Sequence, residues 1–114
     1  MRLPAFAVSL LAVVVLSTTA SADEDWSRYD RDAQVWLSAY AHPTNRAAKL
    51  TALSFASAYF WGFKAGAGIT CPSGLSNATI AAATADVVRE GETQTPLAII
   101  RAMPRVGCYR NDTK

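Results

Sequence analysis

The longest regular pattern of hydrophobic and polar positions lies in residues 46–66, where apolar side chains recur three or four residues apart. Leu53 and Phe60 belong to this series, and its spacing is that of one face of an α-helix. The segment is also rich in alanine, which has the highest helix propensity of all residues. We therefore predict a long helix here, with an N-cap offered by Thr44-Asn45 and an end marked by Gly66, Gly68 and the loop after them.

A shorter helix is predicted for residues 29–41, because Trp36 and Tyr40 form an apolar pair at i and i+4. The sequence His42-Pro43 ends it, since the residue before a proline is pushed out of the helical region. The strongly acidic residues 23–28 are predicted to lie outside any helix as a loose leader.

Two further helices are predicted in the C-terminal half. The first covers about residues 78–89, with Ser76 or Asn77 as its cap and Gly91 after its end. The second follows Thr95-Pro96, which we interpret as an N-cap and a proline at the first helical position. The apolar positions of this second helix are Leu97, Ile99, Ile100 and Met103, and Pro104 limits it.

No segment alternates β-branched and polar residues as a half-buried strand would. The predicted fold class is therefore all-α, a small bundle of about four helices in a single domain.

The first 22 residues have the pattern of a secretory signal. Arg2 precedes a 14-residue apolar run, and small residues follow it up to Ala22. The run is shorter than the roughly 20 apolar residues that a spanning helix needs. We predict cleavage after Ala22, a mature domain of residues 23–114 without a membrane anchor, and a periplasmic or secreted location.

Export decides the chemistry of the two cysteines, Cys71 and Cys108. In an oxidising compartment they are expected to form a disulfide. A bridge between them closes a loop of 38 residues (71 to 108 inclusive), for which loop-closure entropy gives about 4 kcal/mol of stabilisation. With His42 as the single histidine, the chain does not supply a tetrahedral metal site, and no cofactor is predicted.

The net charge and the few residues that could act in catalysis limit the functions that we expect. The formal net charge is +2, without a basic run that would follow a phosphate backbone, so nucleic acid is not a predicted partner. His42 has no nucleophile beside it in the sequence, and the carboxylate pairs Asp30/Asp32 and Glu90/Glu92 are spaced to point apart on a helix. We predict a binding protein rather than an enzyme, with no catalytic residue.

Four aromatic residues lie within residues 59–63, too close together to share one helix face. Some of them must meet the core, and Trp61 is a candidate for contact with a partner. Gly62 and Gly66, spaced as G-x-x-x-G, are predicted to allow close packing of a neighbouring helix.

Short motifs over residues 55–108 resemble one family. They are Tyr59-x-x-Gly62-Phe63, Cys71-Pro72-x-Gly74-Leu75-Ser76, Val87-Val88, Thr95-Pro96-Leu97 and Gly107-Cys108. The pattern resembles the Rap/Tai-type immunity proteins, which protect bacteria from amidase effectors of type VI secretion. The resemblance implies a small helical, periplasmic, disulfide-bonded domain, often dimeric, that blocks the active-site cleft of a peptidoglycan amidase.

The chain departs from the family pattern at Arg89-Glu90-Gly91-Glu92 and at Gly107-Cys108, where the family usually has a His-Pro-like turn and Pro-Cys. Effector specificity is therefore left open. Two alternatives remain: a periplasmic acid-stress chaperone of the HdeA type, and a structural envelope protein. For binding, the expected partner is a protein or a second copy of the chain. The predicted partner-binding residues are Pro72, Ser73, Gly74, Ser76, Gly91, Glu92, Thr93, Gln94 and Trp61.

Overall fold

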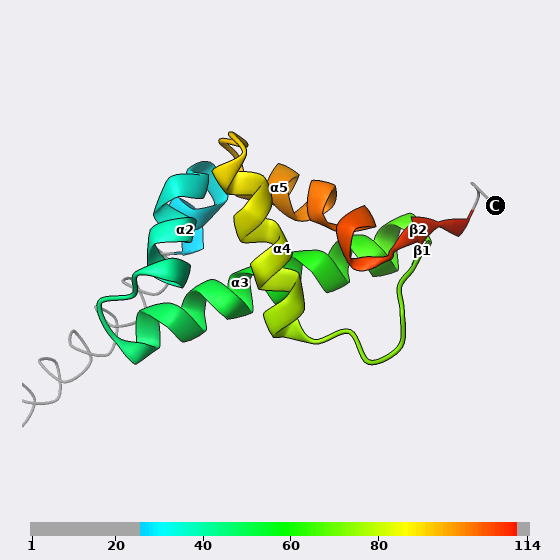
Figure 1. Cartoon of the computed structure of the whole chain (residues 1–114), viewed down its shortest axis with the longest axis horizontal. Helices are drawn as coiled ribbons and strands as arrows, with labels where there is room; N and C mark the ends of the chain where they lie inside the picture. The colour runs from blue at the N-terminus through cyan, green and yellow to red at the C-terminus, as the bar shows by residue number, and fades with distance from the viewer. Residues whose placement is uncertain (1–25, 112–114) are drawn as a thin grey trace, which may run out of the picture.

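Four α-helices of eight or more residues build the part of the chain that the computed structural model describes, residues 26–111 (Figure 1). The prediction of an all-α fold with about four helices and one disulfide is confirmed. The predicted signal, residues 1–22, lies outside the described residues. The helices are α2 (Ala33–Ala41), α3 (Arg46–Ala67), α4 (Asn77–Arg89) and α5 (Thr95–Ala102), with a 3-10 turn η1 (Pro104–Val106) and two short strands, β1 (Ile69–Thr70) and β2 (Tyr109–Arg110).

The long helix α3 is the element against which the others pack: α2, α4 and α5 all contact it. Its N-cap is Asn45, whose side chain accepts a hydrogen bond from the Ala48 amide at 2.8 Å. It ends at Gly68, which has the left-handed φ of 64° that favours glycine at a helix terminus. The start agrees with the prediction, and the last helical residue, Ala67, lies one residue beyond the predicted residue 66, so that the second of the two predicted glycines is the C-cap. None of the helices within residues 26–111 has the length and apolar character to cross a bilayer.

The core lies between α3 and the other helices. Its largest fully buried side chains include Trp36, Phe55, Phe60, Ile80 and Ile99. The Trp36 indole Nε1 donates a hydrogen bond to the backbone oxygen of Ala52 at 2.9 Å, which ties α2 to α3. A buried indole N–H needs such a partner, so this bond fixes the orientation of α2 as well as its position.

The N-terminal boundary differs from the prediction. Residues 26–31 are helical, whereas the sequence predicted a loose leader up to residue 28. The predicted helix 29–41 is also interrupted at Asp32, whose side chain accepts from the Gln34 amide at 2.9 Å and starts α2 at Ala33. The physical reason is burial of Phe55, whose ring lies 5.1 Å from that of Trp26 and 5.7 Å from that of Tyr29. Aromatic burial outweighs the acidic character of the segment.

A short two-stranded sheet and the disulfide join the segment after α3 to the C-terminal end of the described chain. Strands β1 and β2 pair antiparallel, with Ile69 opposite Arg110 and Thr70 opposite Tyr109. Cys71 directly follows β1 and Cys108 directly precedes β2, and the predicted disulfide joins them. The sheet was not predicted, because two residues are too few to produce an alternating pattern.

Gly107 is required for this closure. It has φ of 89°, and a Cβ placed on it would lie 2.9 Å from the Cγ of Pro72. Any other residue would therefore be strained and would collide with the proline ring. The Gly107-Cys108 pair thus serves the contact between the last turn and the loop after β1.

Thr95 does not cap α5 as the sequence suggested. Gln94 is the N-cap, without a side-chain bond, and Thr95 is the buried first residue of the helix. Its hydroxyl donates to the backbone oxygen of Tyr29. Tertiary packing overrides the local capping preference here, because the hydroxyl satisfies a carbonyl on the N-terminal helical turn instead.

The expectation for Gly62 and Gly66 is also wrong within the described part of the chain. No atom of a described neighbour lies within 4 Å of a Cβ placed at either position. Both glycines are exposed on α3. They do not accommodate a neighbouring helix of the same chain, because α4 and α5 pack on the opposite side of α3 through residues such as Phe60.

Candidate protein-binding surface

The outward face of α5 carries two exposed aliphatic side chains. Leu97 and Ile100 expose 43% and 42% of their surface. The inward face of the same helix is formed by Ala98, Ile99 and Ala102, which are buried. The sequence placed Leu97, Ile99, Ile100 and Met103 together as one apolar set. The structure divides that set, because two alanines bring α5 close to the core and turn Leu97 and Ile100 outward.

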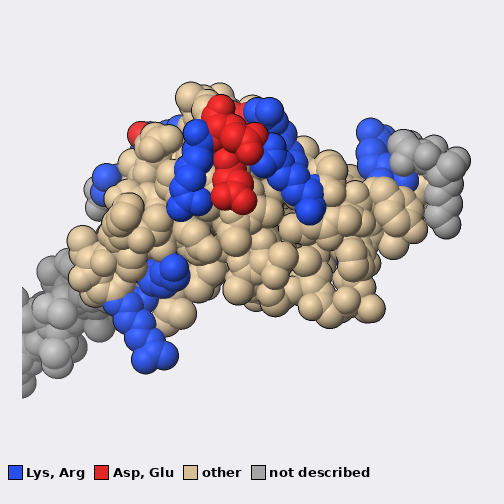
Figure 2. Space-filling model, in the orientation of Figure 1, with Lys and Arg blue, Asp and Glu red and all other residues tan. Residues whose placement is uncertain are grey.

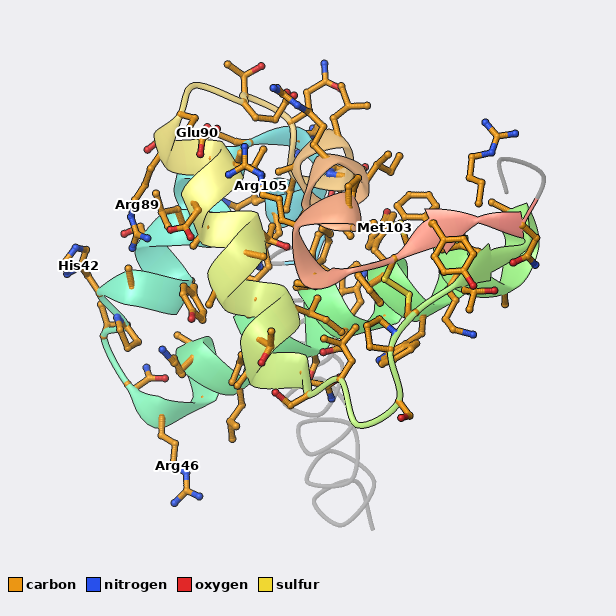
Figure 3. All side chains as sticks on the ribbon, turned by 45° about the vertical axis from the view of Figure 1, so that its right-hand side comes forward. His42, Arg46, Arg89, Glu90, Met103 and Arg105 are labelled. Atoms are coloured by element: carbon orange, nitrogen blue, oxygen red, sulfur yellow. A yellow bond between two sulfur atoms is a disulfide. The ribbon has the colours of Figure 1, made fainter. Side chains whose placement is uncertain are left out.

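Two ion pairs lie beside these aliphatic side chains. Arg101 Nη1 lies 3.1 Å from Glu92 Oε1. Arg105 reaches Glu90 with both terminal nitrogens, each at 2.5 Å from a carboxylate oxygen. Figure 3 shows Glu90 and Arg105 side by side at the end of α4. Figure 2 shows acidic side chains in the middle of this edge with basic side chains on both sides.

The surroundings keep both glutamates charged. The hydrogen bonds from Arg105 hold the pKa of the Glu90 carboxyl below its usual range. The pKa of Glu92 is also lowered, first by the backbone N–H of Gln94 and then by Arg101. Glu92 therefore places a negative charge just before the N-terminus of α5, where the N-cap residue Gln94 makes no capping hydrogen bond with its side chain.

We define the α5 surface as the loop before α5 together with the outward side chains of α5 and η1. It consists of Gly91, Glu92, Thr93, Gln94, Leu97, Ile100, Arg101 and Arg105. The first four of these residues were predicted from the sequence as partner-binding residues. The other four were missed. The available signal was their i, i+3, i+4 spacing opposite the alanines of α5.

The other predicted partner-binding residues lie elsewhere. Ser76 caps α4 through the Thr79 amide, and Gly91 follows the last residue of α4, so the whole 13-residue helix, about 20 Å, separates the two loops. Trp61 donates to the side-chain oxygen of Asn77 at 3.1 Å and therefore lies beside the loop of Pro72, Ser73, Gly74 and Ser76. The predicted residues thus form two separate surfaces rather than one.

A hollow of about 580 Å³ lies between α2 and the start of α3, beside His42. Its lining mixes polar side chains, such as Gln34, Ser38 and Thr51, with alanines and includes the charged Arg28. The His42 imidazole makes no hydrogen bond to any residue within 26–111. No group of three potential metal ligands occurs among the described residues, and no side-chain nitrogen or oxygen buried within them lacks a partner.

Comparison with known proteins gives no relative, since no family model, curated protein or solved structure matches the chain. An aliphatic pair beside charges that are held in place can bind a protein: the pair loses its water on contact, and the charges select the partner.

Proposed function

We propose that this chain is an exported protein-binding domain that recognises its partner through the α5 surface. The observation that carries the proposal is the exposed pair Leu97 and Ile100 beside the ion pairs Glu90–Arg105 and Glu92–Arg101. The disulfide between Cys71 and Cys108 supports export, because such bonds persist in oxidising compartments.

The ion pairs prepare the surface for binding. Each arginine is already held by a carboxylate of the same chain, so less side-chain freedom is lost when a partner docks. The interface would then have an apolar centre and a charged rim, the usual anatomy of a reversible protein complex.

The partner class that we propose is a peptidoglycan amidase, on the basis of the family resemblance. An inhibitor of such an enzyme must place part of its surface in the active-site cleft. The loop between α4 and α5 projects at the upper edge of the molecule (Figure 1) and is continuous with the α5 surface. It is the segment of residues 26–111 that we expect to enter the cleft.

Inhibition of peptidoglycan cleavage by the mature domain, residues 23–114, tests this proposal. The enzyme should be an amidase encoded beside the gene of this chain. We expect stoichiometric inhibition by the wild-type domain and at least a tenfold weaker effect for Ile100→Arg. The matched control is Tyr109→Arg, which changes a side chain that is 45% exposed on β2, away from α5. Equal inhibition by the wild type and Ile100→Arg would argue against the α5 surface, and no inhibition at all would argue against an amidase partner.

One observation favours an acid-stress chaperone as a second candidate. Each carboxylate among residues 26–111 accepts a hydrogen bond within the fold. The five are Asp30, Asp32, Asp86, Glu90 and Glu92. Protonation at pH 2–3 would weaken these bonds together and expose apolar surface, as in other acid states. Binding of a hydrophobic dye that stays unchanged between pH 7 and pH 2 would exclude this candidate.

A further inference from the structure

We propose that the outward face of α3 binds a second copy of this chain, with the two α3 helices antiparallel. We define the α3 face as the seven exposed residues that share one side of this helix. They are Ala47, Leu50, Ser54, Ala58, Trp61, Gly62 and Ala65. This inference is separate from the proposed function, because α5 contacts the buried side of α3 and the α3 face points away from it.

The α3 face is apolar and uncharged over most of the helix. Leu50 exposes 51% of its surface and Trp61 38%. Exposed apolar side chains that share one face mark a candidate interaction site. None of the seven residues carries a charge. The charged residues of the α5 surface contrast with this composition. An uncharged face with large apolar side chains is typical of contacts between identical subunits.

The face is also hollowed on both sides of Ala58. One hollow, of about 430 Å³, is lined by Trp26, Ala58, Gly62 and their neighbours. The other, of about 520 Å³, lies between Leu50 and Trp61. A Cβ placed on Gly62 would meet no described atom within 4 Å, so there is open space directly above this residue.

The order of residues along the face identifies the occupant. Six of the seven positions are symmetric about residue 56: Ala47 corresponds to Ala65, Leu50 to Gly62, and Ser54 to Ala58. The seventh, Trp61, corresponds to the half-buried Thr51 beside the face. An antiparallel partner related by a two-fold axis at residue 56 would therefore place its Leu50 over Gly62 of the first copy, and the reverse. The same chain supplies the projecting side chain and the space that receives it, which is the self-complementarity of a two-fold interface.

A parallel arrangement lacks this fit. It would place Leu50 against Leu50 and Trp61 against Trp61, and it would leave the space above Gly62 empty. Large side chains that meet at the same level hold the helices apart, whereas a large residue opposite a glycine allows close packing. The geometry therefore selects the antiparallel pair.

The strength of the contact follows from its size and its flanking charges. The face extends over about 27 Å at 1.5 Å per residue, which places the contact at the low end of stable interfaces. We expect a reversible dimer with a dissociation constant of roughly 1–100 µM. In the antiparallel register Lys64 lies opposite position 48 of the other copy, two residues from Arg46. Because these like charges repel and salt screens them, dimerisation should strengthen as ionic strength rises.

Sedimentation equilibrium of the mature domain tests the dimer. We expect self-association of the wild type, a loss of at least tenfold in affinity for Leu50→Ala and for Gly62→Leu, and a monomer for Ala58→Glu. Circular dichroism should show that all three variants remain folded, since none of these positions is buried. Ile100→Arg, on the α5 surface, is the matched control and should dimerise as the wild type does.

The register is tested with single cysteines under conditions that keep the native disulfide intact. A mixture of Ser54→Cys and Ala58→Cys should give more cross-linked dimer than either variant alone, because position 54 faces position 58. A wild-type domain that stays monomeric at 200 µM would overturn the dimer. Preferential cross-linking of Ala58→Cys to itself would overturn the antiparallel register. Neither result bears on the α5 surface, whose partner is measured separately with the Ala58→Glu variant.

Discussion

Arg105 holds Glu90 through two parallel hydrogen bonds of 2.5 Å, and this pair joins the end of α4 to the turn after α5. The two residues are 15 apart in the sequence, so the pair fixes the distance between two segments that the loop Gly91–Gln94 alone would leave free. Both groups are exposed, so the pair positions the α5 surface more than it stabilises the fold.

The first prediction concerns pH. The folded pKa of Glu90 is lowered, so the pair stabilises the protein above the ordinary carboxyl pKa of about 4.3, and this stabilisation is lost as pH falls through the folded pKa. Arg105→Gln should therefore lower Tm by less than about 5 °C at pH 7, and by less again at pH 2.5, where Glu90 is more protonated. Thermal unfolding followed by circular dichroism measures both values.

The control for this experiment is Arg89→Gln. Arg89 makes a single longer contact, 3.3 Å, with Asp86 three residues earlier on the same helix. Its substitution should change Tm less than Arg105→Gln at pH 7. A difference in Tm between the wild type and Arg105→Gln that is as large at pH 2.5 as at pH 7 would contradict the role given to Glu90.

A second prediction concerns the Trp36 indole in the core. Trp36→Phe removes the hydrogen bond to Ala52 and leaves a cavity beside α3, so it should destabilise the fold by about 1–3 kcal/mol in urea unfolding. The same substitution at Trp61 removes an exposed bond to Asn77 and should cost less than about 0.5 kcal/mol. Equal effects of the two substitutions would show that α2 is not fixed by its indole.

A third prediction concerns the hydroxyl of Thr95. Thr95→Val keeps the volume but leaves the Tyr29 carbonyl without the hydrogen bond that it accepts in the buried site. The expected cost is about 1–2 kcal/mol, with faster amide exchange in residues 26–31 than in α4. Thr79→Val, at an exposed position in the first turn of α4, is the control. Unchanged exchange in residues 26–31 would mean that Thr95 does not hold this segment.

The fourth prediction concerns the disulfide. Replacing both Cys71 and Cys108 by alanine should lower the free energy of unfolding by about 4 kcal/mol, because the bridge closes a loop with a sequence separation of 37. The oxidised wild type, denatured in guanidinium, should contain no titratable thiol. Two free thiols per chain, or an unchanged unfolding midpoint in the double variant, would refute this account.

The helices α3 and α4 could be predicted closely from the sequence because their own residues determine them. Their caps, Asn45 and Ser76, belong to the predicted pairs Thr44-Asn45 and Ser76 or Asn77, and Gly68 and Gly91 follow their ends. Local signals decided these boundaries, and no distant contact opposed them.

The elements that the sequence did not predict depend on distant partners. Trp26 belongs to a helical segment because its ring packs on Phe55, and Thr95 is buried because its hydroxyl donates a hydrogen bond to the Tyr29 carbonyl. The binding surface was predicted in part for the same reason. The loop Gly91–Gln94 stands out by its polarity, whereas Leu97 and Ile100 were grouped with Ile99 as apolar positions of one helix, because periodicity alone does not tell which side of a short helix faces inward.

The most direct test of the α5 surface is hydrogen exchange of the mature domain with and without a bound amidase, measured by mass spectrometry. The amides of residues 91–105 should be protected in the complex, and those of residues 72–76 should exchange as in the free domain. Protection of residues 72–76 with no change in residues 91–105 would contradict the account and place the partner at the opposite end of α4.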